Sequence, residues 1–295
     1  MTAGRESPKD QRSRHRKPPK LRRITAIFRL RAALPLWAIC AGVLSSPFAP
    51  ALAGDLGRSQ SDIDTERFLS SAEVVESEDV GEGITEPLRV TLRQDGVERQ
   101  AIFKTVDREI DQVSRTTVLE PNFTDKYTYE VAAYRIDRLI GMGLVPATVL
   151  RTLEGEEGSL QLWIEDITTM DKALAEHGDA PIDNFDLLLE RLMLTYVLDA
   201  LIYNVDRNHT NILVDFEDDR FHPIDHSRAF RLHKKIPPMK DTEIKVPQKI
   251  AARLRVLDLA TLEMAVGDLL DAGQVKAIDK RRQTLIKELE KRGLM

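Results

Sequence analysis

The sequence predicts an α+β fold with two lobes, a small β-rich lobe that contains one key helix and a large, mainly helical lobe. Three observations predict it. Residues 88–104 alternate apolar and polar side chains around an Asp-Gly pair, which is typical of a β-hairpin. Residues 129–141 repeat apolar side chains at helical spacing and end at glycine. Helical periodicity returns over 184–202, 261–272 and 275–292.

The chain of 295 residues is long enough for two lobes and an export segment. We expect four parts: a signal peptide over 1–53, a flexible acidic lead over 54–79 with a short helix near 61–70, the small lobe over 80–166 and the large lobe over 167–295.

The N-terminus has the order of a secretory signal peptide. A stretch rich in Arg and Lys leads into apolar residues 32–44, and the small-residue site Ala51-Leu52-Ala53 follows. Because the apolar stretch is short for a membrane span, we predict export to the periplasm or the extracellular space, with cleavage near Ala53 and no stable membrane insertion afterwards. An uncleaved signal anchor that tethers the protein to the membrane is the alternative. The single cysteine, Cys40, lies in this segment, so the mature protein would contain no disulfide.

Charge is divided unequally along the chain. The first 53 residues carry eleven Lys or Arg and two Asp or Glu, whereas the formal net charge of the whole chain is −5, so the remainder carries −14. An acidic domain disfavours nonspecific attraction to nucleic-acid phosphates, and we expect no nucleic-acid partner.

The segment Asn-Val-Asp-Arg-Asn-His-Thr-Asn at 204–211 carries the strongest chemical pattern. Asn211 follows Asp206 by five residues, and Asp225 comes fourteen residues later. Strands at 212–214 and 221–224, joined by an acidic turn, would bring Asn211 and Asp225 to one end of a hairpin. Asp206 would then orient or deprotonate an attacking hydroxyl while Asn211 and Asp225 bind a metal, as in ATP-dependent phosphotransferases. Taken alone, an octapeptide of this kind is a solvated polar turn more often than a catalytic loop.

A lysine and a glutamate upstream complete this pattern. Lys104 ends the apolar run 101–104, and Glu130 follows 26 residues later in the first turns of a predicted helix. A lysine held by a glutamate keeps its ammonium group directed at nucleotide phosphates. A surface glutamate stabilised by the helix dipole is the alternative interpretation of Glu130.

Two further segments are candidates for nucleotide binding. Gly81 and Gly83 would let backbone N–H groups approach the phosphates, although an ordinary linker pair is as plausible a reading. A predicted hairpin over 148–163 leads into a hinge, where the backbone groups of Ile164 and Asp166 would bind adenine.

Three local expectations concern the supporting structure. We expect residues 108–127 to form an insertion between Lys104 and the helix of Glu130, which either shields the nucleotide or is simply a long loop. We also expect Asp183 to cap the helix over 184–202, and Asp199 on that helix to anchor the loop that carries Asp206.

The chain resembles the atypical kinases related to the HipA-type toxin kinases, the phosphatidylinositol 3- and 4-kinases and the secretory-pathway casein kinase family. The resemblance covers roughly residues 80 to 270. It rests on the loop residues Asp206, Arg207 and Asn211, on Asp225 with the residues after it, and on the helix residues Glu130, Ala132, Ala133, Asp137, Arg138 and Gly141. It implies a two-lobed protein-kinase-like fold and ATP with Mg or Mn as cofactors.

Two departures from this group bear on function. Asn208 stands where the group usually has a histidine that helps to bear transition-state charge, so His209 or Arg207 would have to take that role. His226 and Ser227 follow Asp225 in place of Phe-Gly.

The predicted function is an exported kinase that transfers the γ-phosphoryl group of ATP to a hydroxyl of protein Ser/Thr, a sugar or a lipid headgroup. A catalytically inactive binding module with a kinase fold, favoured by Asn208, is one alternative. A nucleotidyl transferase that uses the same pocket is the other.

Overall fold

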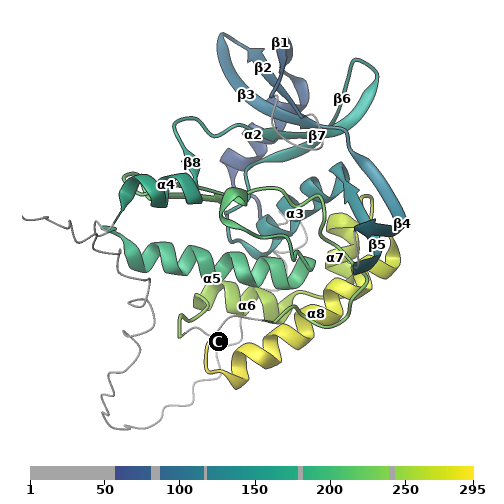
Figure 1. Cartoon of the computed structure of the whole chain (residues 1–295), viewed down its shortest axis with the longest axis vertical. Coiled ribbons are helices and arrows are strands. Elements are labelled where there is room, and N and C mark those ends of the chain that lie inside the picture. The colour runs from purple at the N-terminus through teal and green to yellow at the C-terminus, as the bar shows by residue number, and fades with distance from the viewer. Residues whose placement is uncertain (1–56, 81–86, 116–117, 179–181, 239–242) are drawn as a thin grey trace, which may run out of the picture. The chain divides into compact units, whose positions relative to one another are not determined.

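The small lobe is built on a five-stranded antiparallel sheet with the strand order β1-β2-β3-β7-β6 (Figure 1). In this computed structural model, the strands are β1 (Glu73–Asp79), β2 (Leu88–Gln94), β3 (Val97–Lys104), β6 (Thr148–Leu153) and β7 (Glu156–Leu162). Two-residue turns with positive φ join β2 to β3 at Asp95-Gly96 and β6 to β7 at Glu154-Gly155. Such turns match the twist of antiparallel strands, and both predicted hairpins are confirmed.

The structure describes residues 57–80, 87–115, 118–178, 182–238 and 243–295, with the side chains of 110–123 excepted. All of them belong to one unit of the chain, Pro47–Met295. The expected signal peptide therefore lies outside the described residues. Within the described ranges, none of the helices combines the length and the apolar character needed to cross a bilayer.

Helix α3 (Tyr127–Ile140) lies between the sheet and the helical lobe (Figure 1). It contacts β6 and β7 on one side and α6 and α7 on the other. Ten of its 14 residues are buried, because elements of both lobes cover it. It ends at Gly141, whose φ of 81° gives the left-handed cap that glycine adopts without strain.

The segment before the sheet is ordered, which corrects the expectation of a flexible lead. Helix α2 (Gln60–Ser71) confirms the short helix predicted near 61–70, and a capping box between Ser59 and Asp62 fixes its start. It buries Leu69 against the small lobe, and β1 pairs with β2 along the sheet edge. The segment is polar because α2 lies on the surface and β1 is an edge strand with mostly exposed side chains.

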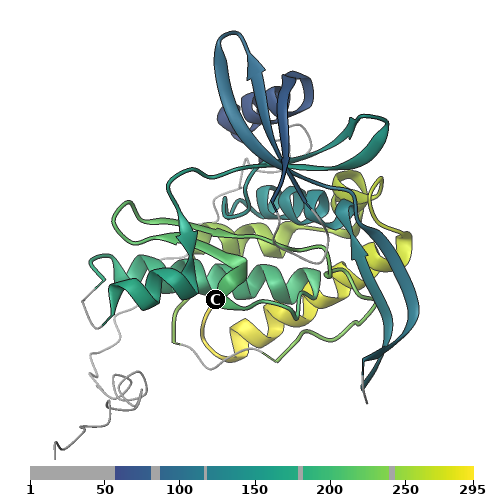
Figure 2. The same ribbon diagram turned by 45° about the horizontal axis from the view of Figure 1, so that its top comes forward.

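The expected insertion between Lys104 and the helix of Glu130 is present, and it is a two-stranded ribbon in place of a long loop. β4 (Asp107–Arg115) and β5 (Val118–Lys126) pair antiparallel, with Asp107 opposite Lys126 at the base of the ribbon. Figure 2 shows the ribbon extending from the end of β3 and returning directly into α3. The buried Asp125 lies at its base.

The large lobe combines helices with a small sheet of order β10-β9-β8. Its elements are β8 (Thr168–Thr169), α4 (Met170–His177), α5 (Phe185–Ile202), the 3₁₀ turn η1 (His209–Asn211), β9 (Ile212–Asp215), β10 (Arg220–Pro223), α6 (Gln248–Val256), α7 (Leu259–Val266) and α8 (Ala272–Lys291). Helix α5 packs along α8, and one hydrophobic cluster is continuous through both lobes. The predicted two-lobed α+β fold is confirmed.

Two helix boundaries differ from the sequence expectation. Asn184, not Asp183, precedes α5, and its side chain makes no capping hydrogen bond. The helix expected over 261–272 ends at Val266 with Gly267 as its C-cap, and a separate helix, α8, begins after Asp271, which accepts from the backbone N–H groups of Gly273 and Gln274. Asp271 is therefore a helix start here, in agreement with capping preferences.

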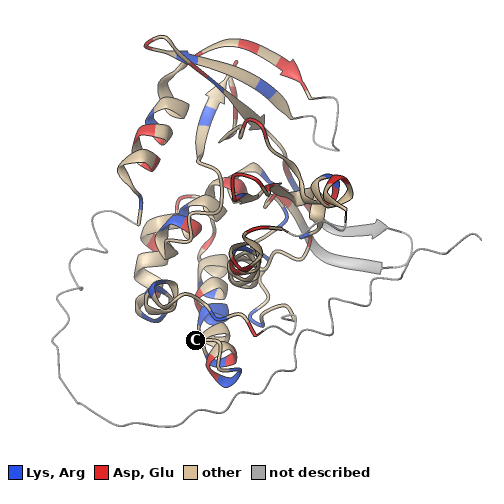
Figure 3. Cartoon of the chain, turned by 90° about the vertical axis from the view of Figure 1, so that its left-hand side faces the viewer, with Lys and Arg blue, Asp and Glu red and all other residues tan. Residues whose placement is uncertain are grey.

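Acidic and basic side chains are interspersed in both lobes (Figure 3), and several form ion pairs that join elements. Arg138 on α3 donates to Asp62 of α2 at 2.7 Å and pairs with the neighbouring Asp137. The fully buried Asp137 also accepts the N–H of Leu144 at 3.0 Å. These contacts fix the end of α3. Asp137 and Arg138, which are among the residues that carry the resemblance to the atypical kinases, therefore have a structural role in this chain.

Gly158 allows β3 and β7 to approach at the position of Lys104. A Cβ at Gly158 would lie 2.5 Å from the Phe103 ring and 2.6 Å from the Lys104 carbonyl oxygen. We predict that Gly158→Ala lowers the free energy of unfolding by about 1–3 kcal/mol, the usual cost of overpacking, measured by urea unfolding. The exposed neighbour Glu157 provides the control, since Glu157→Ala should change little. Equal stability of both variants would contradict this assignment.

Candidate active site

Lys104, Glu130 and Asp225 meet between the two lobes, and of these contacts the sequence analysis expected only the one between Lys104 and Glu130. The Lys104 Nζ lies 2.6 Å from Oε1 of Glu130 and 3.2 Å from Oδ1 of Asp225. Lys104 is the last residue of β3, Glu130 lies in the first turn of α3, and Asp225 follows β10. One ammonium group thus joins the sheet, the helix and the segment beyond the β9–β10 hairpin.

Burial and charge oppose each other in this cluster. The side chain of Glu130 is 1% exposed and that of Lys104 18%. Burial pushes the Lys104 pKa down, but the charges of Glu130 and Asp225 outweigh it, so the pKa rises above its ordinary value. Burial would raise the Glu130 pKa, yet the charge of Lys104 and the His226 side chain, whose Nδ1 lies 3.4 Å from Oε2 of Glu130, hold it well below its ordinary value. Both groups are therefore charged at neutral pH.

The loop with Asp206 is anchored to α5 by an arginine. Arg207 donates from Nε and Nη2 to the two carboxylate oxygens of Asp199, each at 3.0 Å, and both side chains are 8% exposed. Asn204 adds a 3.1 Å hydrogen bond to Asp199 and accepts the Asp206 N–H at 3.1 Å. The expected role of Asp199 as the anchor of this loop agrees with these contacts.

The same arginine connects the loop to the β9–β10 hairpin. Its Nη1 donates to the carbonyls of Asn211 and Ile224, both at 2.6 Å, and the Ile224 N–H donates to the Asn211 carbonyl at 3.1 Å. Asn211 and the residue that precedes Asp225 therefore lie side by side, as the hairpin predicts. The Asn211 amide nitrogen donates to the Asp206 carbonyl at 3.3 Å, which turns the amide oxygen away from that carbonyl.

The donor set around Asn211 and Asp225 fits a hard divalent cation. Asn211 offers an amide oxygen and Asp225 a carboxylate that is 43% exposed on its side chain. Across the described ranges, no group of three or more His, Cys, Asp or Glu side chains converges to hold a metal. Two protein oxygens are the usual contribution to a Mg²⁺ ion that also binds substrate phosphates and water.

The residues proposed to replace the missing histidine are not equivalent. Arg207 is fully engaged in holding the loop, so it does not extend toward a substrate. Asn208 caps η1 by accepting the Thr210 N–H at 2.8 Å, and it carries no charge. His209 is exposed at the start of η1. Of the two residues expected to take the role, His209 is therefore the one whose side chain is not committed to holding the loop.

The predicted nucleotide-binding segments are only partly described. Gly81 and Gly83 lie outside the described residues. Ile164 is half-buried in the connection between β7 and β8. Asp166 is exposed with a φ of 51°, and its carbonyl accepts a hydrogen bond from Arg220. The hinge is therefore tied to β10 through backbone carbonyls.

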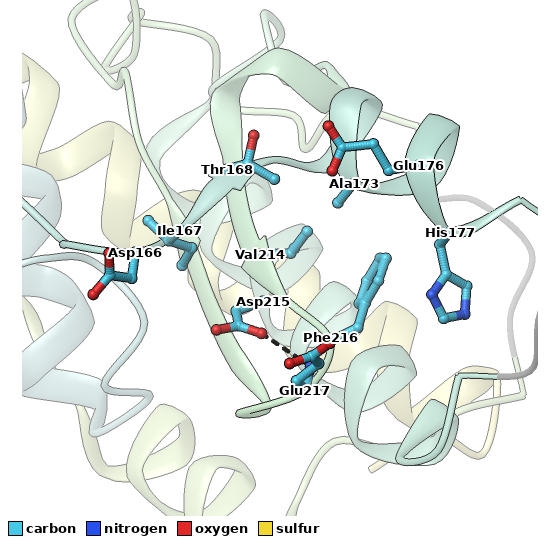
Figure 4. Close-up of a pocket in the computed structure, with 10 residues that line it drawn as sticks. All are labelled: Asp166, Ile167, Thr168, Ala173, Glu176, His177, Val214, Asp215, Phe216 and Glu217. Atoms are coloured by element: carbon cyan, nitrogen blue, oxygen red, sulfur yellow. Dashed lines mark hydrogen bonds between the residues drawn. The ribbon is translucent and has the colours of Figure 1, made fainter.

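A pocket of about 510 Å³ borders this hinge on the large-lobe side (Figure 4). His177 of α4 and Phe216 beyond β9 form one wall, with their rings edge to face and 5.3 Å between centroids. None of the five predicted phosphotransfer residues lines this pocket, which sets it apart from the Lys104 cluster.

Sequence reasoning missed Arg228, which contacts Asp206, and Asp125, which contacts Arg228. Arg228 donates from Nη1 to Oδ2 of Asp206 at 3.0 Å and from Nε to Oδ2 of Asp125 at 3.2 Å. The backbone is joined at the same place, since Lys126 N–H donates to the Ser227 carbonyl at 2.9 Å. Arg228 lies only three residues after Asp225, and this proximity was the signal available in the sequence.

Two bulky residues near the loop have positive φ. Tyr203, which ends α5, has a φ of 56°, and Phe230 has a φ of 59°. The Phe230 N–H donates to the Ile202 carbonyl at 2.6 Å, and its ring packs edge to face on Tyr129 at 5.2 Å. The segment with Asp206 and Asp225 is thus closed by a contact between its two ends.

Comparisons with known proteins bear on the fold. No model of a known protein family matches the sequence, and no curated protein matches it. Solved structures do match. The crystal structure of the Golgi casein kinase is 15% identical, covers 80% of this chain and 76% of its own, and has a TM-score of 0.54. A structure of Fam20 from hydra with sugar is 17% identical over 79% of this chain and 90% of its own, with a TM-score of 0.55. The fold is kinase-like.

A third match is the Golgi casein kinase with Mn/ADP bound, at 15% identity and a TM-score of 0.55 over 79% of this chain and 76% of its own. These structural matches establish the kinase-like fold and confirm the resemblance seen in the sequence.

The depressed pKa of Glu130 predicts a pH-dependent stability. Its carboxylate stabilises the folded state above the ordinary glutamate pKa of about 4.3, and this contribution is lost as pH falls toward the lower folded value. Glu130→Gln should therefore cost about 3 kcal/mol at pH 7, and the difference from wild type should shrink between about pH 5 and pH 3 in thermal unfolding.

Glu290→Gln is the matched control, because it removes a carboxylate paired with Arg255 at the surface and should change stability by less than about 1 kcal/mol. A cost for Glu130→Gln that stays constant down to pH 3 would contradict a charged, paired Glu130.

Proposed function

We propose that this chain is an ATP-dependent phosphotransferase that moves the γ-phosphoryl group of ATP to a hydroxyl acceptor. The observation that carries this proposal is the contact of the Lys104 ammonium with both Glu130 and Asp225, next to the anchored loop that holds Asp206. A buried ion pair of this kind keeps the lysine directed at phosphates, which is the arrangement that phosphoryl transfer requires.

Each residue has a defined task in this proposal. Lys104 contacts the phosphates of the substrate ATP, and Glu130 holds Lys104. Asp206 orients the acceptor hydroxyl and receives its proton as the acceptor oxygen bonds to the γ-phosphorus. The bond from that phosphorus to the β,γ-bridging oxygen breaks, and its electron pair leaves with ADP.

Asn211 and Asp225 would hold Mg or Mn in this site. When bound, the metal neutralises charge on the phosphate oxygens. The Golgi casein kinase with Mn/ADP supports this choice by similarity of fold alone. Protein Ser/Thr, a sugar and a lipid headgroup are the acceptor classes, and the residues around Asp206 do not select among them.

We further propose that the protein acts outside the cytoplasm, after removal of a signal peptide near Ala53. The order of basic, apolar and small residues at the N-terminus supports this, with the uncleaved anchor as the alternative. Ala53 as the last residue removed would be tested by N-terminal sequencing of the exported protein, and an intact N-terminus would favour the anchor.

Nucleotide binding is the first prediction of the proposal. A ligand that binds only the folded state stabilises it by about 2.7 kcal/mol at one hundred times its dissociation constant. ATP with Mg or Mn should raise the unfolding temperature of the protein, and Asp225→Asn should abolish the metal-dependent part. Asp218→Asn, in the exposed turn of the same hairpin, is the control and should keep it. No rise with any nucleotide in folded protein would overturn the proposal.

Turnover is the second prediction. Asp206→Asn should retain ATP binding and lower kcat by about 10²–10⁴, the usual contribution of a general base, measured as ADP release with candidate hydroxyl acceptors. Release of pyrophosphate in place of ADP would identify nucleotidyl transfer instead. Binding without either product would identify the inactive binding module that Asn208 favours.

A further inference from the structure

A nucleoside triphosphate has a phosphate end and a base end, and a site for it must hold both. Asn211 and Asp225, with Lys104 beside Asp225, lie at one end of the β9–β10 hairpin. The other end of the hairpin is its turn, where Asp215 ends β9 opposite Arg220 at the start of β10. The four residues of β9 separate these ends by about 13 Å of extended strand. A base bound near the turn end would therefore lie one strand length from the phosphates.

The turn end of this hairpin contacts the hinge through Arg220. Its Nη1 donates to the Glu165 carbonyl at 2.7 Å, and its Nη2 donates to the Asp166 carbonyl. Nη2 also donates to Oδ2 of Asp215 at 2.6 Å, which holds the guanidinium group against the hairpin. One planar fork thus joins two consecutive hinge carbonyls to the strand that follows Asn211.

Arg220 holds the middle of the hinge. Before it, the Trp163 N–H donates to a carbonyl of β3 at 2.9 Å, and after it Thr168 pairs with β9. Between these two points, Asp166 has a φ of 51°, a backbone conformation that persists in a residue other than glycine where the surroundings maintain it. The course of the hinge backbone at Asp166 therefore depends on the contacts from Arg220.

The direction of the two carbonyls also sets the direction of an N–H group. In a planar trans peptide the C=O and the following N–H point in opposite directions. Because the Glu165 carbonyl points at Arg220, the Asp166 N–H points away from Arg220 and from the hairpin turn. An N–H held in this way suits a ring nitrogen that accepts a hydrogen bond, such as N1 of adenine. Uracil presents an N–H donor at the corresponding edge of its ring, which this group would not accept.

We propose that Arg220 is a positioning residue for the nucleobase, which directs the Asp166 N–H to the acceptor nitrogen of adenine without contacting the nucleotide itself. This inference rests on the proposed ATP-dependent function, with the base at hinge residues 164–166. Since Asn211 and Arg220 are both fixed by one hairpin, the hairpin also sets the distance between the phosphate end and the base end of the site.

The test compares Mg-ATP with Mg-UTP on the full protein by isothermal titration calorimetry. The two ligands share ribose and triphosphate, so the ratio of their affinities reports on the base alone. Wild type should bind ATP at least about tenfold more tightly than UTP. In Arg220→Ala, ATP affinity should fall at least about fivefold, the equivalent of one net hydrogen bond, while UTP affinity changes less than about twofold.

Three further variants separate base positioning from general stability. Arg220→Lys keeps the charge without the fork and should retain part of the preference for ATP. Asp215→Asn weakens the hold on Arg220 and should lower the preference by less than Arg220→Ala does. Arg151→Ala is the matched control, because Arg151 also donates to two backbone carbonyls, those of Leu69 and Ala72 at 2.6 and 2.5 Å, but joins β6 to α2; it should keep the wild-type ratio.

The outcomes are distinct. A folded Arg220→Ala variant with the wild-type ratio, or with equal losses for both nucleotides, would overturn the role of Arg220 and leave the phosphotransferase proposal standing. Where that variant does not fold, Arg220→Lys with the wild-type ratio would do the same. Wild type that binds ATP and UTP equally would also overturn this role alone. Folded wild type that binds neither nucleotide would overturn the phosphotransferase proposal, and this inference with it.

Discussion

The ion pair of Lys104 with Glu130 is the contact on which the arrangement of the site depends. It is formed by the end of a strand, the first turn of a helix and, through Asp225, the segment after a hairpin of the other lobe. Because Glu130 is 1% exposed, the pair lies where charges are costly unless they are well compensated. The N–H of His226 donates to the second oxygen of Glu130 at 3.0 Å and provides this compensation. The cluster therefore fixes the relative placement of three segments that are far apart in the sequence.

A second network acts on the loop side of the site. Arg207 makes two hydrogen bonds to Asp199 and two to backbone carbonyls, so the most conspicuous positive charge in the loop is structural. Arginine suits this task because its planar fork holds a carboxylate and neighbouring carbonyls at once. The loop that displays Asp206 is thus rigid on its inner side, and Asp206 itself is left partly exposed.

Local sequence signals predicted much of this molecule. The hairpins follow from pairs of turn residues such as Asp95-Gly96, and the two ends of the β9–β10 hairpin follow from its length. The features that the sequence did not predict depend on contacts between distant segments or on pairing with a neighbouring strand. The β4–β5 ribbon is polar and lacks a clear alternation, and β1 is an exposed edge strand. The bridge from Arg228 to Asp125 spans 103 positions, so no local pattern could predict it.

The backbone at Tyr203 and Phe230 has a consequence for how the protein loses activity. A bulky side chain at positive φ costs on the order of 1–3 kcal/mol and persists only where the surrounding packing enforces it. These two residues bracket the segment that contains Asp206 and Asp225, and the packing that enforces them comes from α5, α8 and Tyr129. Loosening of those helices would release this strain first at the bracketed segment. On heating, the protein would then lose activity at a lower temperature than the one at which it unfolds. A core mutation would likewise reduce activity before it unfolds the protein.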